Sequence, residues 1–187
     1  VCRMPLCYSG GIKNVDQIER IISLGVEKVG LGSICITDPS IVYEASKRVG
    51  SQSIVAIMDV KKQGILGRYK VFTNNGKKST KYSPLEFLEK FQELGAGEIL
   101  INSINNDGQM NGYDISLIDT IFSSTKLPIT VLGGARNYDD IRNLFKRYGI
   151  IGAAAGSLFV FKGKYKAVLI QYPNEAQKKL IYTNNDF

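Results

Sequence analysis

Residues 9–18 read SGGIKNVDQI, and residues 132–141 read LGGARNYDDI. The likeness continues downstream, where GLGS at 30–33 is matched by AAGS at 154–157. In each copy an apolar run ends in Gly-Gly, a helix-like stretch follows, and a second apolar run ends in Gly-Ser. Equivalent positions lie about 124 residues apart, so the repeat predicts two equivalent halves within one fold.

The glycine pairs at the ends of these apolar runs predict anion sites. Glycine lets backbone N–H groups approach a phosphate closely, although one Gly-Gly pair alone is weak evidence because many tight turns use one. Two matched sets predict a substrate with a phosphate at each end. We expect one cradle to contain Gly10, Gly11, Gly32 and Ser33, and the other to contain Gly133, Gly134, Gly156 and Ser157.

Six short apolar runs alternate with stretches of helical periodicity, and this alternation predicts a parallel sheet. Ser83-Pro84 and Asp38-Pro39 resemble helix N-caps followed by a first-turn proline. The predicted strands are 5–8, 28–31, 53–58, 98–102, 128–132 and 152–155. The predicted helices are 15–24, 39–49, 84–94, 115–124 and 138–148.

The repeat decides how the sheet closes. One period contains four strands, so two periods make the eight strands of a TIM (β/α)8 barrel. Residues 1–187 supply six, and the first residue is Val1 rather than Met. We therefore expect one barrel domain over 1–187 that comprises strands 3 to 8 and lacks the first two βα units. An open, doubly wound sheet is the alternative. The polar segment 61–81, with Asn75-Gly76, predicts a surface hairpin inserted after a strand.

Composition excludes several classes of protein. The 187 residues carry a net charge of +7, and pairs such as Lys61-Lys62 and Lys178-Lys179 look scattered, so we expect no nucleic-acid partner. No apolar run is long enough to cross a membrane, so we expect no membrane as a partner. Three cysteines without a CxxC spacing indicate a reducing, cytoplasmic compartment. The lack of histidine excludes a Ser-His or Cys-His nucleophile and a His-bound metal, and we expect no cofactor.

The acid–base candidates end predicted strands. Asp59 closes the apolar run IVAIMD, where the barrel mouth would desolvate its carboxyl group and raise its pKa, although a strand-end Asp can also merely cap a loop. Asp107-Gly108 follows the strand at 98–102, either as a plain turn or as a substrate contact. Asn102, Ser103 and Asn105 could add hydrogen bonds to a substrate there.

Lys28 and Glu98 each open an apolar strand, which places them at the amino-terminal floor of the predicted barrel. Charges there are usually solvated. If both side chains point inward, they must pair, and the pair could gate a passage through the barrel.

Taken together, these segments resemble the cyclase subunit (HisF) family of imidazole glycerol-phosphate synthase. The resemblance covers nearly the whole chain. It rests on SGGIKNVDQI, LGVEKVGLGS, GSQSIVAIMDVKK, ELGAGEILINSINNDGQMNGYD, LPITVLGGA and AAAGSLFVF.

The resemblance implies an ammonia-using enzyme. A HisH-type glutaminase would dock at the bottom of the barrel, and ammonia would pass through it to a phosphoribulosyl aminoimidazole carboxamide bisphosphate. The products would be imidazole glycerol phosphate and aminoimidazole carboxamide ribotide. Asp59 matches one of two catalytic aspartates, the other ending a first strand that this chain does not contain. Lys28 and Glu98 match the ammonia gate. Positions around the two phosphates match Gly11, Gly32, Ser33, Asp107, Gly108, Gly134, Gly156 and Ser157.

The chain departs from the family pattern at several of these positions. Ser9 replaces a glycine, Gly32-Ser33 an asparagine–threonine pair, and Asn102 a threonine; residues 105–109 replace Asp-Arg-Asp-Gly-Thr. The departures resemble a paralogous branch that is associated with surface polysaccharides and supplies ammonia for an acetamidino group on a sugar. This branch is favoured as the biological role, with the histidine-pathway cyclase as the other enzymatic role. A third reading is an inactive, truncated docking module.

Overall fold

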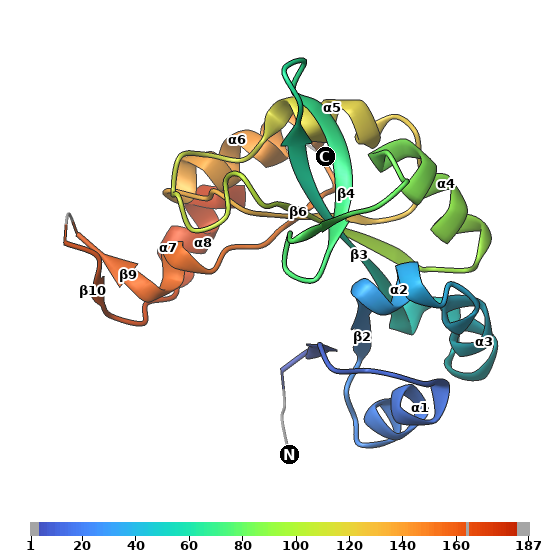
Figure 1. Cartoon of the computed structure of the whole chain (residues 1–187). Helices are drawn as coiled ribbons and strands as arrows, with labels where there is room; N and C mark the ends of the chain where they lie inside the picture. The colour runs from blue at the N-terminus through green and yellow to red at the C-terminus, as the bar shows by residue number, and fades with distance from the viewer. Residues whose placement is uncertain (1–3, 164, 183–187) are drawn as a thin grey trace.

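The computed structural model describes residues 4–163 and 165–182. Its main sheet is built on six parallel strands, whose spatial order is β1-β2-β3-β6-β7-β8 (Figure 1). These six strands span Cys7–Ser9, Lys28–Leu31, Ile54–Gln63, Glu98–Ser103, Ile129–Leu132 and Gly152–Ala153.

The strand order is that of a barrel. Each parallel strand pairs with the next one along the chain, and the order never reverses. A doubly wound sheet needs such a reversal. The sheet curls into part of a barrel with helices on its outer side (Figure 1), so the TIM-type prediction is confirmed and the doubly wound alternative is wrong.

Helices follow the parallel strands in turn. Ser83 caps α4 through a complete capping box, in which its side chain accepts from the Glu86 N–H and Glu86 accepts from the Ser83 N–H. Asp38 is not the N-cap of the following helix as we predicted. Pro39 holds that position, and α3 begins at Ser40, whose hydroxyl donates to the Asp38 carboxylate. The helices are α1 (Val15–Ser23), α2 (Ser33–Thr37), α3 (Ser40–Val49), η1 (Ser51–Ser53), α4 (Pro84–Glu93), α5 (Ile115–Phe122), α6 (Tyr138–Tyr148), α7 (Ser157–Val160) and α8 (Glu175–Tyr182).

The two faces of the sheet differ in burial. Side chains that alternate outward along the strands pack beneath the helices and are fully buried, such as Val29, Ile54 and Ile99. The intervening residues face the concave side and are half-buried, such as Lys28, Glu98 and Leu100. The helix-covered face therefore holds the main core, while the concave face carries polar chemistry at both ends.

The repeat seen in the sequence is reproduced in the backbone. Asn14 and Asn137 cap α1 and α6 in the same way, each accepting a backbone N–H three residues on. Gly10 and Gly133 have φ of 98° and 101°, a region that favours glycine. Both Gly-Ser pairs lead into short helices, α2 and α7. The two halves are thus built from the same local chemistry.

The insertion predicted at 61–81 is larger than one small hairpin. Strand β3 continues past Asp59 to Gln63 and turns back as β4 (Arg68–Thr73), followed by β5 (Lys78–Ser79). Asn75-Gly76 lies in the second turn, between β4 and β5. We call the β3–β4 ribbon, residues 59–73, the hairpin. The sequence also gave no sign of the small antiparallel pair β9 (Phe161–Lys162) and β10 (Ala167–Val168) or of α8.

Candidate active site

The first glycine set gathers around one cavity at the carboxyl ends of β1 and β2. The cavity has a volume of about 320 Å³. The Ser33 hydroxyl oxygen accepts the Asn74 N–H at 3.0 Å, which leaves its own O–H free to donate. Asn75 also lines the cavity and was not predicted. All four predicted cradle residues line it, together with Asp59: Gly10, Gly11, Gly32 and Ser33.

The second glycine set forms a separate, smaller pocket at the ends of β7 and β8. Asp107 and Gly108 join it from the loop after β6. Its volume is about 10 Å³, roughly the space of one water-sized sphere. Its lining includes the four predicted glycine-set residues Gly133, Gly134, Gly156 and Ser157. The structure therefore brings each half of the repeat together in its own pocket.

Asp59 lies between the two glycine sets and is held by a neighbour. The Asn102 side-chain N–H group donates to an Asp59 carboxylate oxygen at 2.9 Å, because β3 and β6 set the two residues directly opposite each other. Burial raises the pKa of Asp59, and the nearby Asp107 raises it further, while the Asn102 hydrogen bond opposes both. The site thus contains one partly desolvated carboxyl group suited to proton transfer.

Asn102 has a second feature. Its carbonyl oxygen Oδ1 is buried and has no hydrogen-bond partner in the described part of the chain. A buried acceptor left unpaired costs free energy, so such an atom favours a ligand that brings a donor.

Two other residues that could have bonded a substrate are engaged elsewhere. Ser103 is buried on the helix-covered side, where its hydroxyl lies 3.5 Å from Asp114. Asn105 accepts the Lys62 backbone N–H at 2.9 Å and so fixes the hairpin. Neither lines the two glycine pockets. Adjacent residues on a strand point to opposite faces, which is why Asn102 reaches the site and Ser103 does not.

The remaining titratable candidates are structural. Cys35 is fully buried, its thiol lies 3.0 Å from the Leu31 carbonyl oxygen, and burial raises its pKa. Tyr113 is also buried, with a raised pKa, and donates to the Ala154 carbonyl oxygen. Among residues 4–163 and 165–182, no three His, Cys, Asp or Glu side chains meet as a metal would require. Asp59 is therefore the carboxylate best placed for acid–base chemistry.

At the opposite, amino-terminal end of the strands, Lys28 and Glu98 do point to the concave side and form a pair. Lys28 Nζ lies 2.7 Å from one Glu98 carboxylate oxygen, and the Thr130 hydroxyl donates to the other at 2.6 Å. The Lys28 side chain is 35% exposed and that of Glu98 13%. The hydrogen bond to Glu98 raises the pKa of Lys28.

Thr130 was missed by sequence reasoning, although the alternation along β7 puts it on the concave face. Two cavities, of about 260 and 570 Å³, flank this cluster, and both are lined by Lys28, Glu98 and Thr130. Gly152 lies beside Thr130, where an added Cβ would collide with the Thr130 hydroxyl. The floor therefore combines a polar cluster with largely apolar hollows.

Comparisons with known proteins place this chain in a family. Residues 1–166 match the family model described as "Histidine biosynthesis protein". The chain is 53% identical over 178 residues to "Putative imidazole glycerol phosphate synthase subunit hisF3" of Vibrio vulnificus, covering 95% of this chain and 68% of that protein. It is 51% identical over 181 residues to a "Putative imidazole glycerol phosphate synthase subunit HisF" of Leptospira borgpetersenii, covering 97% and 71%.

A more distant relative carries the same name without the qualifier. "Imidazole glycerol phosphate synthase subunit HisF" of Pelodictyon phaeoclathratiforme is 38% identical over 159 residues, covering 85% of this chain and 62% of that protein.

In the described part of the chain, no helix has both the length and the apolar character needed to cross a membrane.

Proposed function

Since this chain belongs to the histidine biosynthesis protein family and to its HisF-type cyclases, we propose that it is the ammonia-using cyclase subunit of an imidazole glycerol-phosphate synthase type of enzyme. The substrate would be a phosphoribulosyl aminoimidazole carboxamide bisphosphate. Ammonia would be incorporated into imidazole glycerol phosphate, and aminoimidazole carboxamide ribotide would be released.

The observation that carries this proposal is the position of Asp59 between two glycine pockets at one edge of the sheet. One pocket lies at the ends of β1 and β2 and the other at the ends of β7 and β8. Going from β2 to β7 across the sheet takes three strand-to-strand steps, through β3 and β6. At about 4.8 Å per step, they lie roughly 14 Å apart along the curved sheet. Such a span suits a ligand with a phosphate at each end. The second pocket would have to open around Asp107-Gly108 to admit its phosphate.

Asp59 would move the proton that the reaction requires. Its raised pKa makes this carboxyl group better suited than an exposed Asp to accept and return a proton. The Asn102 N–H group would keep the carboxylate oriented, and the unpaired Asn102 Oδ1 would accept an N–H or O–H group of ammonia or substrate. Backbone N–H groups of the glycine loops would bind the phosphates.

The concave face offers a route for ammonia. Glu98, Leu100 and Asn102 alternate along β6 and so form a column from the floor to the site. In this proposal a glutaminase subunit docks over the hollows at the floor, and the Lys28–Glu98 pair gates the entry of ammonia.

The decisive experiment supplies the bisphosphate and an ammonium salt to the full-length protein and measures the imidazole product. Asp59→Asn should abolish turnover while preserving substrate binding, because only the proton-transferring group is lost. Asp16→Asn is the matched control, since it removes a carboxylate exposed on α1. Normal turnover in Asp59→Asn would exclude Asp59 from the chemistry.

A second candidate is favoured by the pattern of relatives. Identity is 44–53% to the proteins named "Putative" and 34–38% to those named without that word. Asn102 and Gly32-Ser33 also depart from the cyclase pattern. In this alternative, the protein delivers ammonia for acetamidino modification of a surface-polysaccharide sugar. Tight binding of the bisphosphate without any imidazole product would favour it over the cyclase.

A further inference from the structure

The hairpin and the residues after it carry a net charge of +7, which equals the net charge of the whole chain. Segment 61–81 contains seven of the 24 Lys and Arg residues and none of the 17 Asp and Glu residues, so the rest of the chain is balanced. None of the seven forms an ion pair with a carboxylate in the described residues. The basic residues are therefore concentrated here, and not scattered as the sequence suggested.

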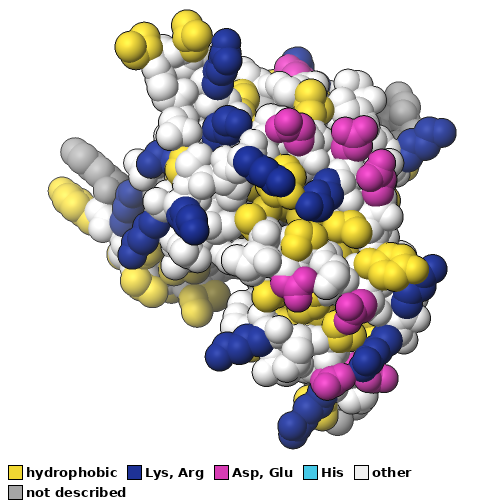
Figure 2. All heavy atoms as spheres, turned by 45° about the vertical axis from the view of Figure 1, so that its right-hand side comes forward, with side chains coloured by type: hydrophobic (Ala, Val, Ile, Leu, Met, Phe, Trp, Pro, Cys, Tyr) yellow, Lys and Arg dark blue, Asp and Glu magenta, His cyan; other side chains and the backbone are white. Residues whose placement is uncertain are grey.

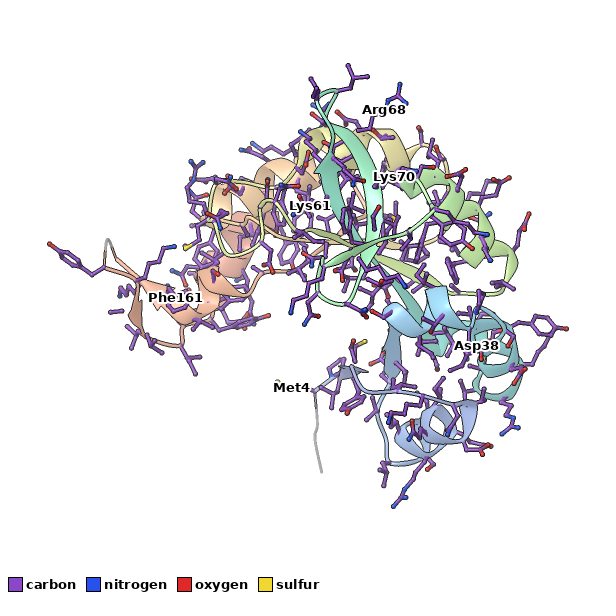
Figure 3. The ribbon with its side chains drawn as sticks, viewed as in Figure 1. Met4, Asp38, Lys61, Arg68, Lys70 and Phe161 are labelled. Carbon is purple, nitrogen blue, oxygen red and sulfur yellow. The ribbon has the colours of Figure 1, made fainter. Side chains whose placement is uncertain are left out.

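Three of these cations share one face of the hairpin. Lys61 and Lys70 lie directly opposite each other, and Arg68 is two residues from Lys70 on the same strand. We call these three residues the basic face. Figure 3 shows Arg68 nearest the free end, with Lys70 and Lys61 further down the ribbon. Like charges directly opposite each other destabilise a sheet, so folding alone does not account for this arrangement.

The free end of the hairpin is apolar. Ile65 is fully exposed and Leu66 is 78% exposed. Gly64 and Gly67 flank them, with φ of 73° and 59°. In Figure 2 the end of the hairpin is the apolar protrusion at the top of the molecule, with a basic side chain beside it. Burying such side chains in an apolar medium is favourable.

The substrate site does not account for the outer end of the hairpin, although Lys61 shares a face of β3 with Asp59. No Lys or Arg of the segment lines either glycine pocket; Asn75 is its only contribution. The Gln63–Arg68 row lies four rows beyond the Asp59–Phe72 row, roughly 13 Å along the ribbon. Hydrogen bonds from the Tyr69 hydroxyl to Asp114 and from the Lys62 N–H to Asn105 hold the row just before this last one, and the turn beyond it exposes Ile65 and Leu66.

We propose that this hairpin binds the surface of a membrane rich in anionic lipid, with Ile65 and Leu66 inserted and the basic face against the lipid phosphates. The order along the ribbon, apolar first and cationic behind, matches the order of acyl chains and phosphates in a lipid leaflet. An acidic protein surface would supply the same charge, but Leu is under-represented among the residues that dominate protein interfaces, whereas the exposed end of this hairpin presents Ile65 and Leu66. The expectation of no membrane partner rested on the lack of a spanning segment, which does not bear on peripheral binding.

The test measures cosedimentation of the full-length protein with vesicles of phosphatidylcholine mixed with phosphatidylglycerol, and with vesicles of phosphatidylcholine alone. We expect binding to the anionic vesicles only, and release by salt. Arg68→Gln should weaken binding about fivefold, and Lys61→Gln, Arg68→Gln and Lys70→Gln together about a hundredfold. Ile65→Ser with Leu66→Ser should weaken it at least about tenfold.

Matched controls change the same chemistry elsewhere. Arg20→Gln, Lys47→Gln and Lys146→Gln remove equal charge, and Leu24→Ser with Ile150→Ser removes equally exposed apolar groups; both sets should alter binding by less than about twofold. Residues 1–187 contain no tryptophan, so Leu66→Trp adds a probe to this part of the protein, and its emission, taken as the difference from the unmodified protein, should shift to the blue on anionic vesicles. The proposal would be overturned if the protein did not bind anionic vesicles at low salt, and this result would instead point to an acidic protein partner. It would also be overturned if the hairpin variants and the control variants lost equal amounts of vesicle binding.

Discussion

Replacement of Lys28 by methionine tests the polar cluster at the floor of the sheet. Methionine keeps most of the apolar stem but removes the ammonium group, which leaves Glu98 bonded only to Thr130. Leaving a fully buried charge without its partner costs about 3–5 kcal/mol, whereas an exposed pair contributes about 0–1 kcal/mol. With Glu98 13% and Lys28 35% exposed, solvent screening reduces the larger value, and we expect the free energy of unfolding to fall by about 1–2 kcal/mol.

The assay is a double-mutant cycle with Glu98→Gln, measured by urea unfolding. Lys28→Met should cost stability when Glu98 is present and little when Glu98 is already glutamine. The pH dependence on the alkaline side has a definite sign. Because Glu98 raises the pKa of Lys28, this stabilisation is present from neutral pH up to pH 10.5 and is lost as pH rises further. A coupling free energy below about 0.3 kcal/mol would refute the reasoning.

The same variant separates structure from function. If the pair gates ammonia, Lys28→Met should impair turnover fed by glutamine through the partner subunit, and should leave turnover fed by ammonium salts nearly unchanged. Ammonium added from solution can reach the site from the open, carboxyl end. Equal loss of both activities would show that Lys28 maintains the fold rather than the passage.

Three further predictions concern the site and its frame. Burial raises the pKa of Asp59, so its ionised form lowers the stability of the folded protein. Asp59→Asn should therefore raise the free energy of unfolding at neutral pH, and this gain should vanish below about pH 3.8. An unchanged free energy of unfolding at neutral pH would contradict this. Gly11→Ala should lower the free energy of unfolding by about 1–2 kcal/mol, because φ at Gly11 is 73° but its surroundings are open. Gly134→Ala should lower it by about 3 kcal/mol or more, because the added Cβ would collide with the Gly112 carbonyl oxygen. Equal losses of stability in thermal unfolding would argue against this. Ser83→Ala should lower the free energy of unfolding by about 1 kcal/mol through loss of the α4 capping box, measured by urea unfolding against Ser124→Ala at an exposed position after α5 as control.

Much of the frame followed from local sequence patterns. The six parallel strands and five main helices were predicted within two residues at each end, except that β3 runs to Gln63, because a buried strand and an amphipathic helix have different periods. The two glycine sets were also predicted, and each lies in its own pocket. The short elements α2 and α7, and the pair β9–β10, were not predicted, because they are too short to show a period.

The hairpin illustrates a different limit. The sequence marked 61–81 as polar and β-prone, and Asn75-Gly76 drew attention to the second turn. In the structure, β3 itself continues to Gln63, so the first turn, Gly64 to Gly67, joins the longer pair. A chain segment gives no sign of whether a strand stops at the sheet or extends beyond it, because both states have the same backbone preference.

The sequence by itself determined the order of the elements, their parallel arrangement and the duplicated glycine turns, since these depend on backbone preferences and on the spacing of apolar residues. Only the tertiary structure decided that Asn102 meets Asp59, that Thr130 joins Lys28 and Glu98, and that Lys61 faces Lys70. The physical reason is register: side chains alternate between the two faces of a sheet, so the pairing of distant strands decides which residues meet, and a shift of one residue would turn each of them to the other face.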